Sequence, residues 1–193
     1  REVFLTPFKQ AIQKGGAISV MASYNEIDGV PSHANQWLLR DVLRKEWGFK
    51  GFVVSDYFAI RELHERPELF GNHLAEDCKQ AAVLAAKAGV NIELPDPDCY
   101  VHLVELVRKG ILKESLLDEL ITPMLLWKFK LGLFEDPYVD PGVAEEIVGC
   151  EAHRKLALLA ARKTIALLKN VDATVPLKPK KIKTIAVIGP NAH

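Results

Sequence analysis

Three short apolar runs, each followed by a loop and a helix-like pattern, constrain the fold of this chain most strongly. They are "AISVMASY" (17–24), "GFVVS" (51–55) and "VNIELP" (90–95). Strands that alternate with helices pair in parallel, because each intervening helix returns the chain to the same end of the sheet. The sequence therefore predicts an α/β fold with a parallel sheet.

The helical patterns that accompany these runs have recognisable boundaries. Asn35 is a candidate N-cap for the second pattern, and Pro123 lies inside the last one, where it should kink or divide the helix. The loop at 25–35 is long for a connection from strand to helix, and the loop after residue 55 contains Pro67. The predicted helices span residues 2–16, 35–49, 73–89, 98–110 and 113–132.

The character of the chain changes after Leu133. Residues 134–149 combine prolines with acids and predict a linker. A helix is predicted at 151–164, followed by strands at 165–170 and 184–188, with a basic solvated segment between the strands. Three strand–helix units do not close an eight-stranded barrel. The chain also starts at Arg1 without Met, so we expect it to be part of a longer protein.

Composition excludes several classes of protein. The 25 basic residues balance the 25 acidic ones, which argues against nucleic acid and anionic membranes as partners. No apolar run approaches the roughly 20 residues of a membrane helix. Cys78, Cys99 and Cys150 are widely spaced, without a C-x-x-C pair, so they predict neither a disulfide framework nor a zinc site. They leave the redox compartment open.

Candidate chemistry lies where the strands end, because parallel α/β folds bind ligands at the carboxyl ends of their strands. Asp56 follows the second run, and by position alone a helix cap or structural ion pair is favoured over a nucleophile. Tyr24, at the end of the first run, is placed to donate a hydrogen bond to that carboxylate. Tyr57 and Phe58 offer either an apolar wall for a sugar or core packing.

Other polar residues predict little chemistry. Asp96 and Asp98 occupy a proline-rich turn, and His64 and His73 lie in a loop, where such residues are usually solvated. The glycine after the last run lacks the G-x-G-x-x-G pattern of dinucleotide sites. We therefore predict no metal site and no cofactor.

The longest informative stretch is "SVMASYNEIDGVPSHANQWLLRDVLRKEWGFKGFVVSDYFAI". It resembles glycoside hydrolase family 3, and "AGVNIELP", "KFKLGLFEDPY" and "KIKTIAVIGPNAH" resemble later segments of the same family in the same order. The resemblance implies a (β/α)8-like barrel followed by an α/β sandwich domain. Residues 1–133 would be the C-terminal portion of the catalytic barrel, 134–149 a linker, and 150–193 the N-terminal portion of the sandwich.

The resemblance also implies site residues. Asp56 matches the nucleophile of the family's S-D-W motif, and Tyr24 matches the tyrosine of its S-Y-N motif. Met21 matches a methionine that lines the glycone site, and Tyr57 stands where the family has tryptophan. That departure puts the subsite shape in question. The implied reaction is retaining, exo-acting hydrolysis of terminal β-D-glucosyl or β-D-xylosyl residues, without a cofactor.

Parts of the implied site lie outside the sequence. The family's glycone-gripping residues would precede Arg1, and its general acid/base would follow His193, so the rest of the polypeptide is the expected partner. Glu93 is expected to be a supporting or ion-paired residue rather than that acid/base. A second hypothesis is that the chain alone is a non-catalytic structural or weak sugar-binding module. A lyase or aldolase would need a lysine or metal cluster at a strand end, which the sequence does not offer. The family is often secreted or periplasmic, but the sequence does not decide the compartment or the sugar.

Overall fold

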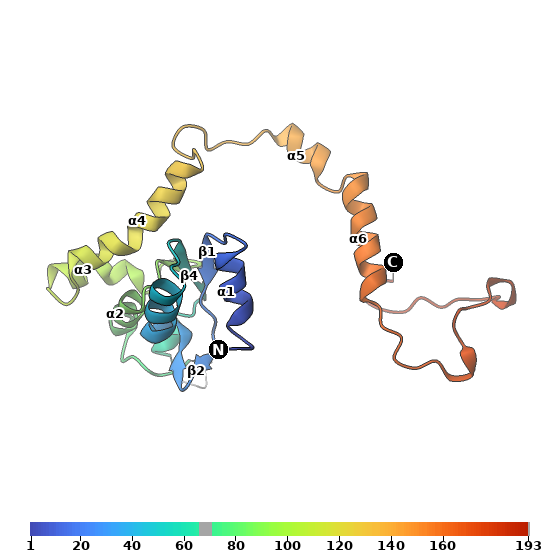
Figure 1. Ribbon diagram of the computed structural model, residues 1–193, viewed down its shortest axis with the longest axis horizontal. Helices are drawn as coiled ribbons and strands as arrows, with labels where there is room; N and C mark the ends of the chain where they lie inside the picture. Colours follow the sequence, from blue (N-terminus) through green and yellow to red (C-terminus); the bar gives the residue numbers. More distant parts are fainter. Residues whose placement is uncertain (66–70, 193) are drawn as a thin grey trace. The chain divides into compact units, whose positions relative to one another are not determined.

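The computed structural model describes residues 1–65 and 71–192. Pro67 of the predicted loop and His193 at the end of the predicted second domain lie outside the described residues. The chain forms two compact units, Arg1–Pro137 and Tyr138–His193, whose elements are labelled in Figure 1.

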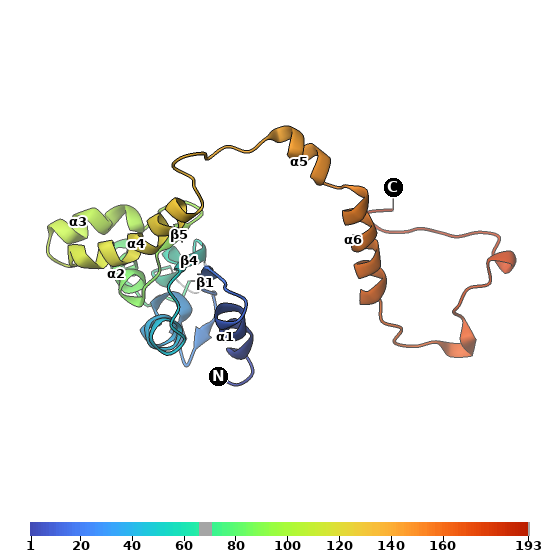
Figure 2. The ribbon, with the colours of Figure 1, turned by 45° about the horizontal axis from the view of Figure 1, so that its top comes forward.

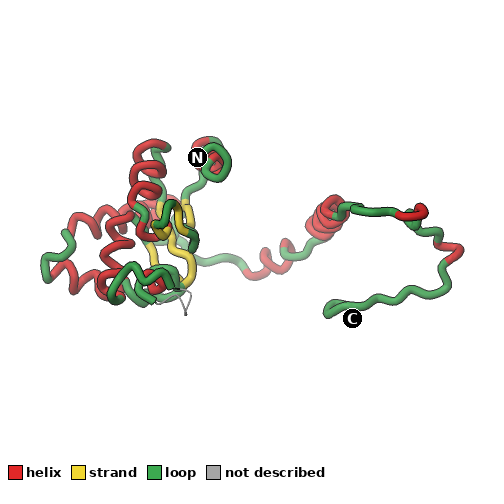
Figure 3. The backbone as a smooth tube through the Cα atoms, turned by 90° about the horizontal axis from the view of Figure 1, so that it is seen from below, coloured by secondary structure: helices red, strands yellow, loops and turns green. Residues whose placement is uncertain are grey.

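The sheet of the first unit is parallel, as predicted. Its strands are β1 (Ser19–Met21), β4 (Phe52–Tyr57) and β5 (Ile92–Leu94), with β4 in the centre. Figure 3 shows them side by side in yellow. Val53 and Ser55 on β4 are completely buried, as expected for the middle strand of a sheet packed against helices. The α/β prediction is confirmed.

Helices surround this sheet. α1 (Thr6–Gln13) lies beside β1, whereas α2 (Cys78–Ala88), α3 (Leu103–Arg108) and α4 (Glu114–Lys130) gather on the other side (Figures 1 and 2). The alanines of α2 are buried, which lets neighbouring elements approach closely. Gly89, at φ 100°, ends α2 in the left-handed conformation that glycine adopts readily. No described helix is long and apolar enough to cross a membrane.

The helix predicted at 35–49 is η2 (Trp37–Glu46), which has π-type turns. Asn35 acts as predicted at its start, because its side chain accepts a hydrogen bond from the Leu38 N–H at 2.9 Å. On this element Leu39 is buried, whereas Trp37 is exposed. A period of 3.6 residues does not describe π-type turns.

Two other predictions for the first unit need revision. The predicted loop at 25–35 contains a hairpin, β2 (Glu26–Ile27) with β3 (Val30–Pro31), followed by η1 (Ser32–Ala34). The predicted helix at 113–132 is α4, which continues through Pro123 rather than being divided there. The helix predicted at 98–110 is formed by η5 (Tyr100–His102) and α3.

The second unit contains helices but no strand among its described residues 138–192 (Figure 3). α6 (Glu151–Thr164) has the predicted bounds, and α5 (Pro141–Ile147) lies inside the predicted linker. Two short elements, η6 (Val171–Ala173) and η7 (Pro179–Lys181), follow. The strands predicted at 165–170 and 184–188 are not formed, because a strand is defined by a hydrogen-bonded partner. The assignment of residues 150–193 to a sandwich domain stays a prediction.

Candidate active site

The carboxyl end of β4 contains a bulge beside Asp56. Val54 pairs with Ile92 and Tyr57 pairs with Leu94, so β4 advances three residues while β5 advances two. The Ser55 hydroxyl accepts the Leu94 N–H at 2.8 Å and secures the irregular pairing. A bulge bends its strand and redirects side chains. Asp56 is half-buried and lies between the buried Ser55 and the exposed Tyr57 on this strand.

Asp56 is not the cap of the next helix. That helix, η3 (Arg61–Leu63), has Ile60 at its N-cap position. The Asp56 carboxylate instead accepts the N–H of Tyr57 at 2.8 Å, and the Asp56 N–H donates to His33 Nε2 at 3.1 Å. The capping alternative is therefore wrong, and the carboxylate is held at the strand end by local main-chain bonding.

His33 is a site residue that sequence reasoning missed. Its side chain is only 2% exposed, and its Nε2 accepts the Asp56 N–H, which places its ring proton on Nδ1. Burial lowers the pKa of His33 to about 4, although the negative charge of Asp56 acts in the opposite direction. A neutral imidazole therefore supports the main chain of Asp56. The only sequence signal was its place in the long loop at 25–35.

Tyr24 lies beside Asp56, as predicted, with a different hydrogen-bond partner. Its hydroxyl donates to the main-chain oxygen of Tyr57 at 2.5 Å. Partial burial raises the pKa of Tyr24, and the charges of Asp56 and Glu62 raise it further. The predicted contact between the ends of β1 and β4 is therefore present, although the Tyr24 proton is directed to the peptide next to the carboxylate.

Exposed side chains lie at the carboxyl ends of β1 and β4. Met21 is 54% exposed, Tyr24 46% and Tyr57 55%. Tyr57 and Phe58 meet edge to face, with ring centres 6.4 Å apart. Phe58 has φ 61°, a left-handed conformation that costs a bulky residue energy and that often occurs at functional sites. The core-packing alternative for Tyr57 and Phe58 is wrong, since both rings reach the surface.

Glu93, at the end of β5, is already engaged. It is only 6% exposed and accepts the N–H of Cys99 at 3.0 Å and that of Tyr100 at 2.6 Å. Burial raises the pKa of Glu93, while these two main-chain bonds lower it. The arrangement favours the expected supporting role, in which Glu93 holds the loop after β5.

The remaining candidates lie apart from Asp56. A hollow in the first unit is lined by residues that include Met21, Ala22 and Ser23, but not Asp56. Asp98 forms an ion pair with Arg61 at 3.0 Å. Among the described residues, one group has the spacing of a metal site, and it contains none of the predicted site residues.

Comparison with known proteins identifies the family. Residues 1–125 match the Glycosyl hydrolase family 3 N terminal domain. The chain is 39% identical to a β-xylosidase of Formosa agariphila, with 100% of this chain and 27% of that protein aligned. It is also 39% identical to a periplasmic β-glucosidase of Salmonella typhimurium, with 98% of this chain and 24% of that protein aligned.

Solved structures agree with this assignment. A β-glucosidase from Erythrobacter marinus superimposes with a TM-score of 0.83 and 40% identity, over 92% of this chain and 23% of that one. A β-glucosidase from Listeria innocua in complex with glucose gives a TM-score of 0.77 and 39% identity, over 90% and 23% of the two chains. The chain belongs to glycosyl hydrolase family 3, and its parallel sheet is part of that family's barrel. It spans about a quarter of the length of the curated relatives that it matches.

Proposed function

We propose that this chain is the nucleophile-bearing region of a retaining exo-β-glycosidase that hydrolyses terminal β-D-glucosyl or β-D-xylosyl residues. The observation that carries the proposal is the half-exposed Asp56 carboxylate, turned out of the central parallel strand by a bulge. The names of the relatives, which are β-xylosidases and β-glucosidases, support the substrate class.

Asp56 would act as an ionised nucleophile. Its carboxylate oxygen attacks the anomeric carbon while the glycosidic C–O bond breaks, and a second carboxyl group protonates the departing oxygen. That second group then takes a proton from water, which attacks the anomeric carbon and releases Asp56. The two carboxyl groups of a retaining pair lie about 5–5.5 Å apart. We assign the second group to another part of the polypeptide, because Glu93 is buried and bonded to main-chain N–H groups.

The exposed side chains around Asp56 would bind the sugar. Tyr57 presents a flat apolar face suited to a sugar ring, and Met21 adds apolar surface at the end of β1. Tyr24 bonds to the peptide next to Asp56 and fixes the approach of β1 to β4. His33 supports the Asp56 main chain by accepting its N–H. In this scheme the described residues orient the nucleophile and the glycone without a cofactor.

Replacing Asp56 tests this proposal in the protein at its full natural length. Asp56→Ala should lower kcat on an aryl β-glucoside or β-xyloside by more than about 10⁴-fold, as expected for a removed nucleophile. Added azide or formate should restore turnover by attacking in place of the carboxylate. Asp96→Ala, which removes an exposed carboxylate after β5, is the matched control. An Asp56→Ala variant that is active without an added nucleophile would refute the assignment.

A second candidate concerns the 193 residues alone. The engagement of Glu93 with main-chain N–H groups favours a non-catalytic structural or weak sugar-binding module in isolation. An assay of the isolated polypeptide distinguishes the candidates, since clear turnover contradicts the module and supports a complete site within these residues.

A further inference from the structure

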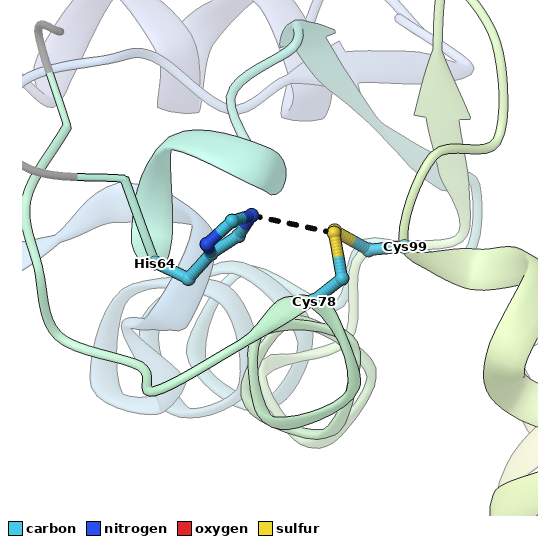
Figure 4. A group of neighbouring side chains, drawn as sticks. All are labelled: His64, Cys78 and Cys99. Atoms are coloured by element: carbon cyan, nitrogen blue, oxygen red, sulfur yellow. Dashed lines mark hydrogen bonds between the residues drawn. The ribbon is translucent and has the colours of Figure 1, made fainter.

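His64, Cys78 and Cys99 bring three metal-binding atoms together, although they are far apart in the sequence. One nitrogen and two sulfur atoms lie within 4.8 Å of one another. His64 Nε2 lies 3.4 Å from Cys78 Sγ, and Figure 4 shows the imidazole directed at the two sulfurs. Cys99 is completely buried, whereas His64 and Cys78 are half-buried. We propose that these three side chains form a zinc site.

The geometry suits zinc. Tetrahedral zinc binds sulfur at about 2.3 Å and imidazole nitrogen at about 2.0–2.1 Å, which separates such donors by about 3.5 Å. The observed separation between His64 and Cys78 is 3.4 Å. Two thiolates and one imidazole favour zinc over hard cations such as Mg²⁺ and Ca²⁺, which prefer oxygen. A water molecule would complete the four ligands that zinc takes.

Two of the three donors, His64 and Cys78, lie at the ends of helical elements. His64 follows η3, where the Leu63 main-chain oxygen accepts the N–H groups of Leu74 and Ala75 at 2.7 and 2.8 Å. Cys78 opens α2, whose N-cap Asp77 accepts the Gln80 N–H at 2.8 Å. Donors anchored in this way require little rearrangement to bind a cation.

The third donor is anchored by Glu93, which also supplies negative charge. Its carboxylate accepts the Cys99 N–H and so fixes the loop after β5. The same loop carries Asp98 directly before Cys99, so two carboxylate residues, Glu93 and Asp98, accompany the third donor.

Zinc at this position would connect three segments: the one after η3, the start of α2 and the loop after β5. The first and last of these follow the ends of β4 and β5, so the metal would stabilise the rim that carries Asp56. The site is independent of the proposed glycosidase chemistry, because none of its donors contacts Asp56 among the described hydrogen bonds. Its expected effect is therefore on the stability of this rim.

Metal titration of the reduced, chelator-treated protein at full natural length tests the proposal. Zn²⁺ should bind and raise Tm, and Co²⁺ in its place should give a thiolate-to-metal absorption band. We expect zinc binding to weaken by at least about 100-fold in each of three variants, Cys78→Ser, Cys99→Ser and His64→Asn. This loss exceeds the effect of most substitutions that change only the residues supporting metal ligands. Cys150→Ser, in the second unit, is the matched control and should leave binding unchanged.

Two outcomes would overturn the zinc site. The first is that all three variants have the same zinc stoichiometry and the same cobalt absorption as the parent protein. The other is a Cys78–Cys99 disulfide in the purified protein, with no zinc binding after its reduction. His64→Asn keeps the test decisive if Cys99→Ser fails to fold, because an exposed edge of the imidazole leaves room for the change. Circular dichroism spectra establish folding for each variant.

Discussion

Asp56 on β4 and Glu93 on β5 are acidic residues of neighbouring strands, but their surroundings differ. Asp56 sits on a bulge, half-exposed among exposed side chains. Glu93 is buried, and its two oxygens accept main-chain N–H groups of the following loop. Both lie where parallel folds bind ligands. The contrast shows that a position at a strand end does not by itself make a carboxylate a catalytic candidate. Its hydrogen bonds and its exposure must also be considered.

The largest expected effects distinguish loss of activity at Asp56 from loss of stability at Glu93. Asp56→Asn should lower kcat by more than about 10⁴-fold and leave the free energy of unfolding nearly unchanged. Glu93→Ala should lower the free energy of unfolding by about 3 kcal/mol, because it leaves the N–H groups of Cys99 and Tyr100 without their acceptor. Steady-state kinetics and denaturant unfolding measure the two effects. Similar losses of activity and stability in both variants would remove the distinction.

The next effect concerns His33, which accepts the main-chain N–H of Asp56. Its pKa is about 4 in the folded state against 6.5 without the fold. Below pH 6.5 the unfolded chain binds a proton that the folded chain does not, so stability falls as pH drops towards 4. The loss should reach about 3 kcal/mol and be absent above pH 6.5.

His33→Gln provides the comparison, because glutamine keeps an acceptor for the Asp56 N–H and does not titrate. The free energy of unfolding of each protein is measured as a function of pH. Subtracting the values of the variant from those of the parent protein should isolate the loss of stability that His33 causes between pH 6.5 and 4. The exposed His153→Gln is the control. A difference curve that is flat across this range contradicts the role assigned to a buried neutral imidazole.

The smallest effect concerns the aromatic surface beside Asp56. Tyr57→Ala should raise KM for an aryl β-glycoside by about 10-fold, corresponding to roughly 1.4 kcal/mol of lost apolar contact. Tyr57→Phe keeps the ring face and should change KM by less than about 3-fold on the same grounds. Equal KM values for the alanine variant and the parent protein would mean that Tyr57 does not contact the substrate.

Much of the first unit was predictable because its signals are local or follow from parallel pairing. Apolar runs predicted β1, β4 and β5, and the common direction of parallel strands predicted that Tyr24 and Asp56 would meet. The bounds of α6 followed from its helical period. The strands and α6 depend on residues that are close together in the sequence. The meeting of Tyr24 and Asp56 depends on one rule, that parallel strands end at the same edge of the sheet.

Other features were not predictable because they depend on contacts between distant residues. The bulge at Asp56 arises from the register with β5, and the contact of His33 arises from how the long loop folds back. The donors of the zinc site belong to three different segments, so no sequence spacing signals them. In the second unit, apolar runs without a pairing partner among residues 138–192 did not form the predicted strands.

Covalent trapping tests the central claim most directly. The protein at its full natural length is incubated with a 2-deoxy-2-fluoro-β-glycoside bearing a good leaving group, which slows hydrolysis of a glycosyl-enzyme, and its peptides are analysed by mass spectrometry. The account predicts one sugar per active site, attached to Asp56 and absent from Asp56→Asn. A sugar attached to Glu93 or to any other carboxylate would contradict it.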